Sequence, residues 1–82
     1  MLKKIKVYGR LRKFIGQAVL EADVNSPIEA LSFLHCNFKG LEKHMADQYY
    51  QINVGDLKIT EDLLGIRTES DIQIIPLAHG NF

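Results

Sequence analysis

The chain has 82 residues, 46% of them hydrophobic, and its ten Lys and Arg balance ten Asp and Glu to a formal net charge of zero. This length predicts one domain spanning residues 1–82, and the hydrophobic fraction excludes a disordered chain. Zero net charge argues against a dedicated nucleic-acid binder, which normally carries a basic excess.

Alternation of apolar and polar residues predicts a first strand from Lys3 to Tyr8 and a second over residues 17–24. The segment between them is expected to form a polar-basic turn that carries Leu11, Phe14 and Ile15. The two strands therefore predict an N-terminal hairpin.

A helix is predicted to begin at Pro27, because Ser26 is a favourable N-cap and Glu29 would complete a capping box. Its expected apolar stripe consists of Ile28, Leu31, Leu34, Phe38 and Leu41. Gly40 is expected to end this helix, with a further helical turn between residues 42 and 48. Phe33 lies off the stripe, which leaves open packing on the N-terminal loop at Phe14 or Ile15 and contact with a partner.

The remaining strands are predicted at residues 49–54, 57–60 and 71–77, with a tight turn at Gly55-Asp56 and a 3₁₀ turn within residues 61–66. Strands flanking one helix predict an α+β architecture: a mixed sheet of four to five strands with one main helix packed on one face. The apolar pair Ile74-Ile75 suits a central strand of the sheet.

The order and spacing of several short motifs resemble the tail assembly protein I family of lambda-type phages. These motifs are Tyr8-Gly9-x-Leu11, Glu29-Ala30-Leu31, Tyr49-Tyr50-Gln51-Ile52 and Ile74-Ile75-Pro76-x-x-x-Gly80. The resemblance covers almost the whole chain. It implies a ubiquitin-like β-grasp domain, related to sulfur-carrier proteins, with a role in building the phage tail tip alongside other tail assembly proteins. In a β-grasp arrangement the first and last strands run parallel in the middle of the sheet.

The alternative is a sulfur carrier, or a relic of one, acting with an adenylating enzyme. A carrier needs a thin glycine end that can thread into its activating enzyme, because glycine lacks a side chain and tolerates any φ. Here Asn81 and the bulky Phe82 follow Gly80. The ending therefore favours a non-enzymatic interaction module over a carrier.

Nucleophilic and metal chemistry find little support in the sequence. His35 and Cys36 are neighbours on the predicted helix and do not face each other, so Cys36 lacks a base within reach. The scattered His35, Cys36, His44 and His79 lack the paired spacings of zinc sites. We therefore expect no catalytic residue, metal, cofactor or small-molecule substrate.

The location is expected to be the cytoplasm of a bacterial host. The lone Cys36 can form no internal disulfide, and the sequence has neither a signal-peptide core nor an apolar run long enough to span a membrane. We expect no membrane partner.

The strand phases predict an outward sheet face that mixes aromatic, aliphatic and basic side chains. With Val7 and Ile74 facing the helix, Tyr8, Tyr49 and Ile75 would lie at the centre of the opposite face. The predicted partner-binding residues are Lys4, Lys6, Tyr8, Tyr49, Gln51, Gln73, Ile75 and Gly80. Tyr anchors with a polar rim suit a protein interface, and an ordinary solvated face is the alternative.

The charges are unevenly placed along the chain. Basic residues crowd the N-terminus: Lys3, Lys4, Lys6, Arg10, Arg12 and Lys13. Acidic residues gather later, at Glu61, Asp62, Glu69 and Asp71. Three interpretations stay open: screened solvated charges, an electrostatic docking edge for an acidic partner, and an RNA-binding cluster whose affinity would collapse with rising salt.

Overall fold

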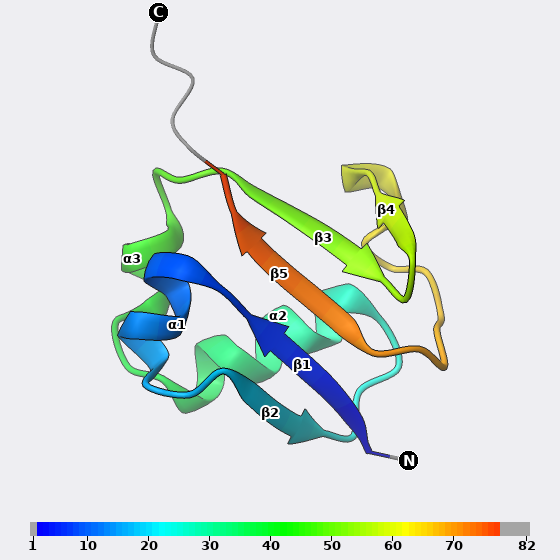
Figure 1. The fold of residues 1–82 in the computed structure, drawn as a ribbon, viewed down its shortest axis with the longest axis horizontal. Helices are drawn as coiled ribbons and strands as arrows, with labels where there is room; N and C mark the ends of the chain where they lie inside the picture. The colour runs from blue at the N-terminus through cyan, green and yellow to red at the C-terminus, as the bar shows by residue number, and fades with distance from the viewer. Residues whose placement is uncertain (1, 78–82) are drawn as a thin grey trace, which may run out of the picture.

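A computed structural model describes residues 2–77, whose strands form one mixed five-stranded sheet in the order β2-β1-β5-β3-β4 (Figure 1). The strands are β1 Lys3–Val7, β2 Val19–Ala22, β3 Tyr50–Val54, β4 Leu57–Ile59 and β5 Ile72–Pro76. β1 and β5 are parallel neighbours at the centre, as the family resemblance implied, and the other pairs are antiparallel. The protein is thus a small α+β domain with a mixed sheet.

The central strands are held together by matched apolar side chains. Ile5 lies opposite Ile72, and Val7 lies opposite Ile74. All four are at most 2% exposed. Because side chains alternate along a strand, this register sends every second residue of β1 and β5 to the same covered face.

Helix α2, Pro27–Asn37, begins where the sequence predicted, because its N-cap is satisfied. The Ser26 hydroxyl accepts a hydrogen bond from the Glu29 N–H at 3.3 Å. The Glu29 carboxylate reaches back to the Asn25 N–H, one residue before the N-cap, at 3.1 Å. The capping box is therefore present in a shifted form.

The predicted apolar stripe is confirmed for Leu31, Leu34, Phe38 and Leu41, which lie in the core or pack against it, and is wrong for Ile28. Ile28 is 46% exposed, whereas Pro27, Ala30 and Leu34 are buried and Leu31 is half-buried. The Ile28 N–H donates to the Leu64 carbonyl at 2.9 Å. This bond ties the first turn of α2 to the end of η1, a segment far away in the sequence.

The end of α2 also differs from the prediction. The helix stops at Asn37, and Phe38 is an extended C-cap, so Gly40 instead precedes α3, Leu41–Met45. Phe33 is half-buried and packs against the core cluster. The expected 3₁₀ turn is confirmed as η1, Glu61–Leu63.

The predicted turn between the first two strands is wrong, because Gly9–Ile15 forms helix α1. Leu11 and Ile15, one helical turn apart, are both buried. Gly16 ends the helix in the left-handed conformation at φ 86°, and its N–H donates to the Arg12 carbonyl at 2.8 Å. β1 and β2 still pair antiparallel, so the helix is inserted into the expected hairpin.

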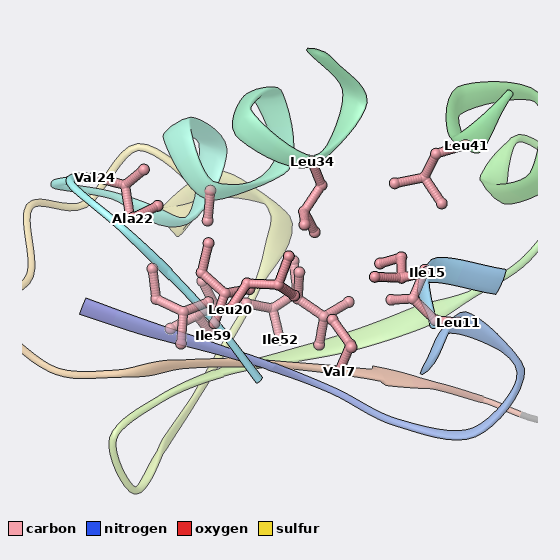
Figure 2. Packing of buried hydrophobic residues seen from close by; sticks show 14 residues of the cluster. Val7, Leu11, Ile15, Leu20, Ala22, Val24, Leu34, Leu41, Ile52 and Ile59 are labelled. Atoms are coloured by element: carbon pink, nitrogen blue, oxygen red, sulfur yellow. The ribbon is translucent and has the colours of Figure 1, made fainter. Parts of the chain in front are cut away.

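The core lies on the side of the sheet that α2 covers, and Figure 2 shows its side chains filling the layer between helix and strands. Leu41 from α3 and Leu11 from α1 extend this layer at one end. The other side of the sheet contributes none of the buried cluster. Within residues 2–77, no helix has the length and apolarity needed to cross a membrane.

Candidate protein-docking face

The side of the sheet opposite α2, here called the open face, carries the alternate residues of all five strands. One row crosses the whole sheet through successive registers: Val19, Lys6, Gln73, Asn53 and Lys58. A second row joins Ile75 to Gln51. The face is therefore continuous from one sheet edge to the other.

Three carboxamides form a hydrogen-bonded ladder in the middle of the open face. The Gln51 side-chain amide donates to the Asn53 side-chain oxygen at 3.1 Å. The Asn53 amide in turn donates to the Gln73 side-chain oxygen at 3.4 Å. These contacts fix which way each amide presents its donor and acceptor, a preorganised arrangement for recognising a polar partner.

The charges of the open face are mainly basic. Lys4, Lys6 and Lys58 point to this side, and Glu21 stands opposite Lys4 in the β1–β2 register. Asp71 is engaged by the backbone, because its carboxylate accepts a hydrogen bond from the Lys4 N–H at 3.0 Å. An acidic partner surface would meet complementary charge here.

Apolar and aromatic groups lie at the margin of the ladder. Tyr49, one residue before β3, is 65% exposed, and Val19 is 44% exposed. Tyr8, one residue after β1, and Ile75 are half-buried. The predicted centre of Tyr8, Tyr49 and Ile75 thus holds one fully presented aromatic ring rather than two.

Seven of the eight predicted partner-binding residues fall on the strands of this face or one residue beyond them. Gly80 lies outside the described residues. Sequence reasoning missed Asn53 and Lys58, which complete the row across the sheet. Asn53 alternates correctly with Gln51 and could have been found, whereas Lys58 joins the face only through the β3–β4 register.

Two members of the N-terminal basic cluster are used inside the protein. Lys3 is 4% exposed and its ammonium donates to the Val24 carbonyl at 2.6 Å. Arg10 donates to the Gln48 side chain and, at 2.8 Å, to the Leu77 carbonyl. These contacts remove two charges from the cluster that an RNA-binding interpretation requires.

The backbone of Leu77, just after β5, makes hydrogen bonds through both its N–H and its carbonyl, next to Tyr49. The Leu77 N–H donates to the Tyr49 carbonyl at 2.9 Å, while Arg10 binds the Leu77 carbonyl. Gly9 has a φ of +58°, and a Cβ there would lie 3.4 Å from the Pro76 ring. The backbone that presents Tyr49 is therefore well fixed.

A pocket of about 200 Å³ opens on the other side of the sheet, near β4 and η1. Its walls are formed by Tyr50, Ile52, Ile59, Thr60, Glu61 and Leu64. The pocket is smaller than the roughly 300–1,000 Å³ typical of small-molecule sites. No sequence pattern predicted it, because it forms where three separate segments meet.

The fold perturbs the ionisation of Tyr50. Burial raises the pKa of its phenol, an effect reduced by nearby Arg10 and reinforced by Asp47. Within residues 2–77 its hydroxyl is buried without a hydrogen-bond partner. The neutral phenol is thus the form that this environment favours.

The cysteine and histidines of the described segment are dispersed. Cys36 is exposed on α2, and the Nε2 atoms of His35 and His44 are buried without a hydrogen-bond partner among residues 2–77. No three His, Cys, Asp or Glu side chains of that segment come together as they would around a metal ion. His79 lies outside the described residues.

No protein-family model, curated protein or solved structure matches the chain. The functional argument therefore depends on the sequence motifs, the sheet topology and the chemistry of the open face.

Proposed function

We propose that the protein is a ubiquitin-like β-grasp domain that acts as a non-enzymatic interaction module in phage or prophage tail-tip assembly, in the host cytoplasm. The parallel β1–β5 pair at the sheet centre and the single main helix on one face support the β-grasp assignment. The motifs from Tyr8-Gly9 to Ile74-Ile75-Pro76 support the tail-assembly role.

The observation that carries the docking role is the amide ladder of the open face. Gln51, Asn53 and Gln73 are prearranged by their own hydrogen bonds, and lysines stand on both sides of them. Amide donors and acceptors with lysines on both sides suit an acidic polypeptide surface. The occupant is therefore an acidic segment of another tail assembly protein.

The test is quantitative capture of purified tail assembly proteins by the wild type and by Tyr49→Ala. Tyr49 is a large exposed anchor beside the ladder, so its truncation is expected to weaken capture by more than about 1 kcal/mol. Lys6→Ala is expected to change the salt dependence of association more than the final affinity. Ser32→Ala is the control, because Ser32 is exposed on α2, which lies on the opposite side of the sheet from the open face.

Circular dichroism verifies that each variant is folded before capture is measured. If folded Tyr49→Ala binds with wild-type affinity and Lys6→Ala keeps the wild-type salt dependence, the open face is only solvated surface.

A further inference from the structure

The protein has zero net charge but two oppositely charged ends. Residues 9–16 and 39–48, which include α1 and α3, hold five basic and two acidic side chains, a net charge of +3. Residues 55–71, which include β4 and η1, hold two basic and five acidic side chains, a net charge of −3. Figure 1 shows these two groups at opposite ends of the longest axis.

The basic end presents a fixed aromatic ring. Phe14 on α1 is 43% exposed. One side of its ring stacks on His44 of α3, with centroids 4.4 Å apart and planes inclined by 25°. The Phe14 Cζ also lies 3.7 Å from where a Cβ of Gly40 would be. Because the ring is already held in place, burying it in a partner costs little side-chain entropy.

Two exposed cations lie on the same helix as this ring. Arg12 and Lys13 precede Phe14 on α1, and both are exposed. Among residues 2–77, neither makes a side-chain hydrogen bond of the kind that engages Arg10. The basic end thus combines an apolar projection with positive charge, a combination that requires an apolar hollow with an acidic rim.

The acidic end contains such a hollow, the pocket of about 200 Å³ described above. Ile52, Ile59 and Leu64 supply apolar walls, and Glu61 lies at its margin. An apolar cavity of about 150 Å³ in another protein binds benzene, so this volume accommodates one phenyl ring. Asp62, the residue after Glu61, adds a second exposed carboxylate.

Three apolar side chains of the acidic end are exposed. Leu57 on β4 is 56% exposed, Leu63 on η1 is 38% exposed, and Ile66 in the following turn is 40% exposed. These side chains would gain from being covered. They add exposed apolar surface to the elements that form the pocket.

We propose that the protein associates head to tail with copies of itself, with Phe14 of one copy entering the pocket of the next. Arg12 and Lys13 then face Glu61 and Asp62 across the contact. The two contacting surfaces differ, so the contact is heterologous. After two copies join, one basic end and one pocket are still free to bind further copies. Association therefore continues beyond a dimer, and zero net charge removes overall repulsion between copies.

The open face takes no part in this contact. Failure of self-association would therefore leave the proposed docking of a tail partner unaffected, and failure of docking would leave self-association unaffected. The test is sedimentation velocity from micromolar to millimolar concentration at low and high salt. The wild type is expected to grow past the dimer with concentration at low salt and to return towards monomer at high salt, because screening weakens the charge pairing.

Two charge-reversed variants decide the geometry. Arg12→Glu/Lys13→Glu destroys the basic side, and Glu61→Lys/Asp62→Lys destroys the acidic side. Each alone is expected to stay monomeric. An equimolar mixture is expected to associate again, because the intact basic end of one variant meets the intact pocket of the other, and the two reversed surfaces are also complementary in charge.

Phe14→Ala tests the apolar part of the contact and is expected to reduce association without changing the circular dichroism spectrum. Lys4→Glu/Lys6→Glu on the open face is the control, since it makes the same net charge change as Arg12→Glu/Lys13→Glu and should associate like the wild type. A monomeric wild type at millimolar concentration overturns the proposal. So does self-association of either reversed variant at the wild-type level, or a mixture that remains monomeric.

Discussion

The two faces of the sheet use the same strands for different purposes. On β5, Ile74 faces α2 and is fully buried, whereas its neighbour Ile75 faces the other way and is half-buried. On β1, buried Val7 follows half-buried Lys6 in the same manner. Adjacent residues therefore serve separate roles: the covered face supplies stability, and the open face is free to carry recognition chemistry.

The strongest test of this difference uses two identical substitutions one residue apart. Ile74→Ala should cost about 2–5 kcal/mol of unfolding free energy, because it opens a cavity between sheet and helix. Ile75→Ala removes the same atoms from a half-buried side chain on the side that no helix of residues 2–77 covers (Figure 1), and it should cost clearly less. Chemical denaturation of both variants measures the contrast, and equal losses would show that the two faces do not differ in packing.

The rotation of α2 over the covered face can be tested in the same way. Leu34→Ala removes a fully buried side chain and should cost about 2–5 kcal/mol. Half-buried Leu31→Ala should cost less, and exposed Ile28→Ala least. If denaturation ranks Ile28→Ala above Leu34→Ala, α2 does not turn Leu34 towards the sheet and Ile28 towards solvent.

A smaller effect is expected where the covering helix begins. Ser26→Ala removes the side-chain acceptor for the Glu29 N–H and should cost about 0.5–2 kcal/mol. Ser32→Ala, a mid-helix exposed position, is the control and should be near neutral. An equal effect of the two substitutions on the thermal midpoint would mean that the cap contributes nothing to holding α2 on the sheet.

The pH dependence of stability should reveal Tyr50, which faces the covered side of β3. Burial raises the pKa of its phenol above the ordinary value of 10.0, so the folded state retains the proton that the unfolded chain loses first. Its contribution is complete below pH 10 and is lost as the pH rises through the folded pKa. Tyr50→Phe should flatten this alkaline loss in denaturation curves measured on both sides of pH 10, and an unchanged slope would contradict the assignment.

The smallest expected effect concerns Cys36, on the side of α2 that faces away from the sheet. Its side chain is exposed, so Cys36→Ser creates no cavity and should leave the unfolding free energy nearly unchanged. A loss comparable to that of Leu34→Ala would show that this side of α2 is covered.

Local patterns predicted the elements whose signals lie within a few residues. The Ser26-Pro27-Glu29 arrangement located the start of α2, and alternation placed Ile5, Leu20, Ile52 and Ile74 on the covered face correctly. Helix α1 was missed because it is only seven residues long and begins at a glycine without a side-chain cap. Its one helical signal was the Leu11–Ile15 spacing, which a turn can also contain.

The candidate site was predictable only in part. Alternation gave Lys6, Gln51, Gln73 and Ile75 as one face, but the ladder that joins them needs the antiparallel pairing of β3 with β5. The pocket was not predictable, because its shape depends on how β3, β4 and η1 pack against one another.

The sequence by itself determined the α+β class, the strand phases and the start of the main helix, because each depends on short-range periodicity or capping. The tertiary structure decided that Ile28 is exposed while Leu34 is buried, and it fixed the pairing of β1 with β5. It also decided which charges remain available, by turning Lys3 and Arg10 inward to backbone carbonyls. These outcomes depend on contacts between residues far apart in the chain, whose partners no local pattern specifies.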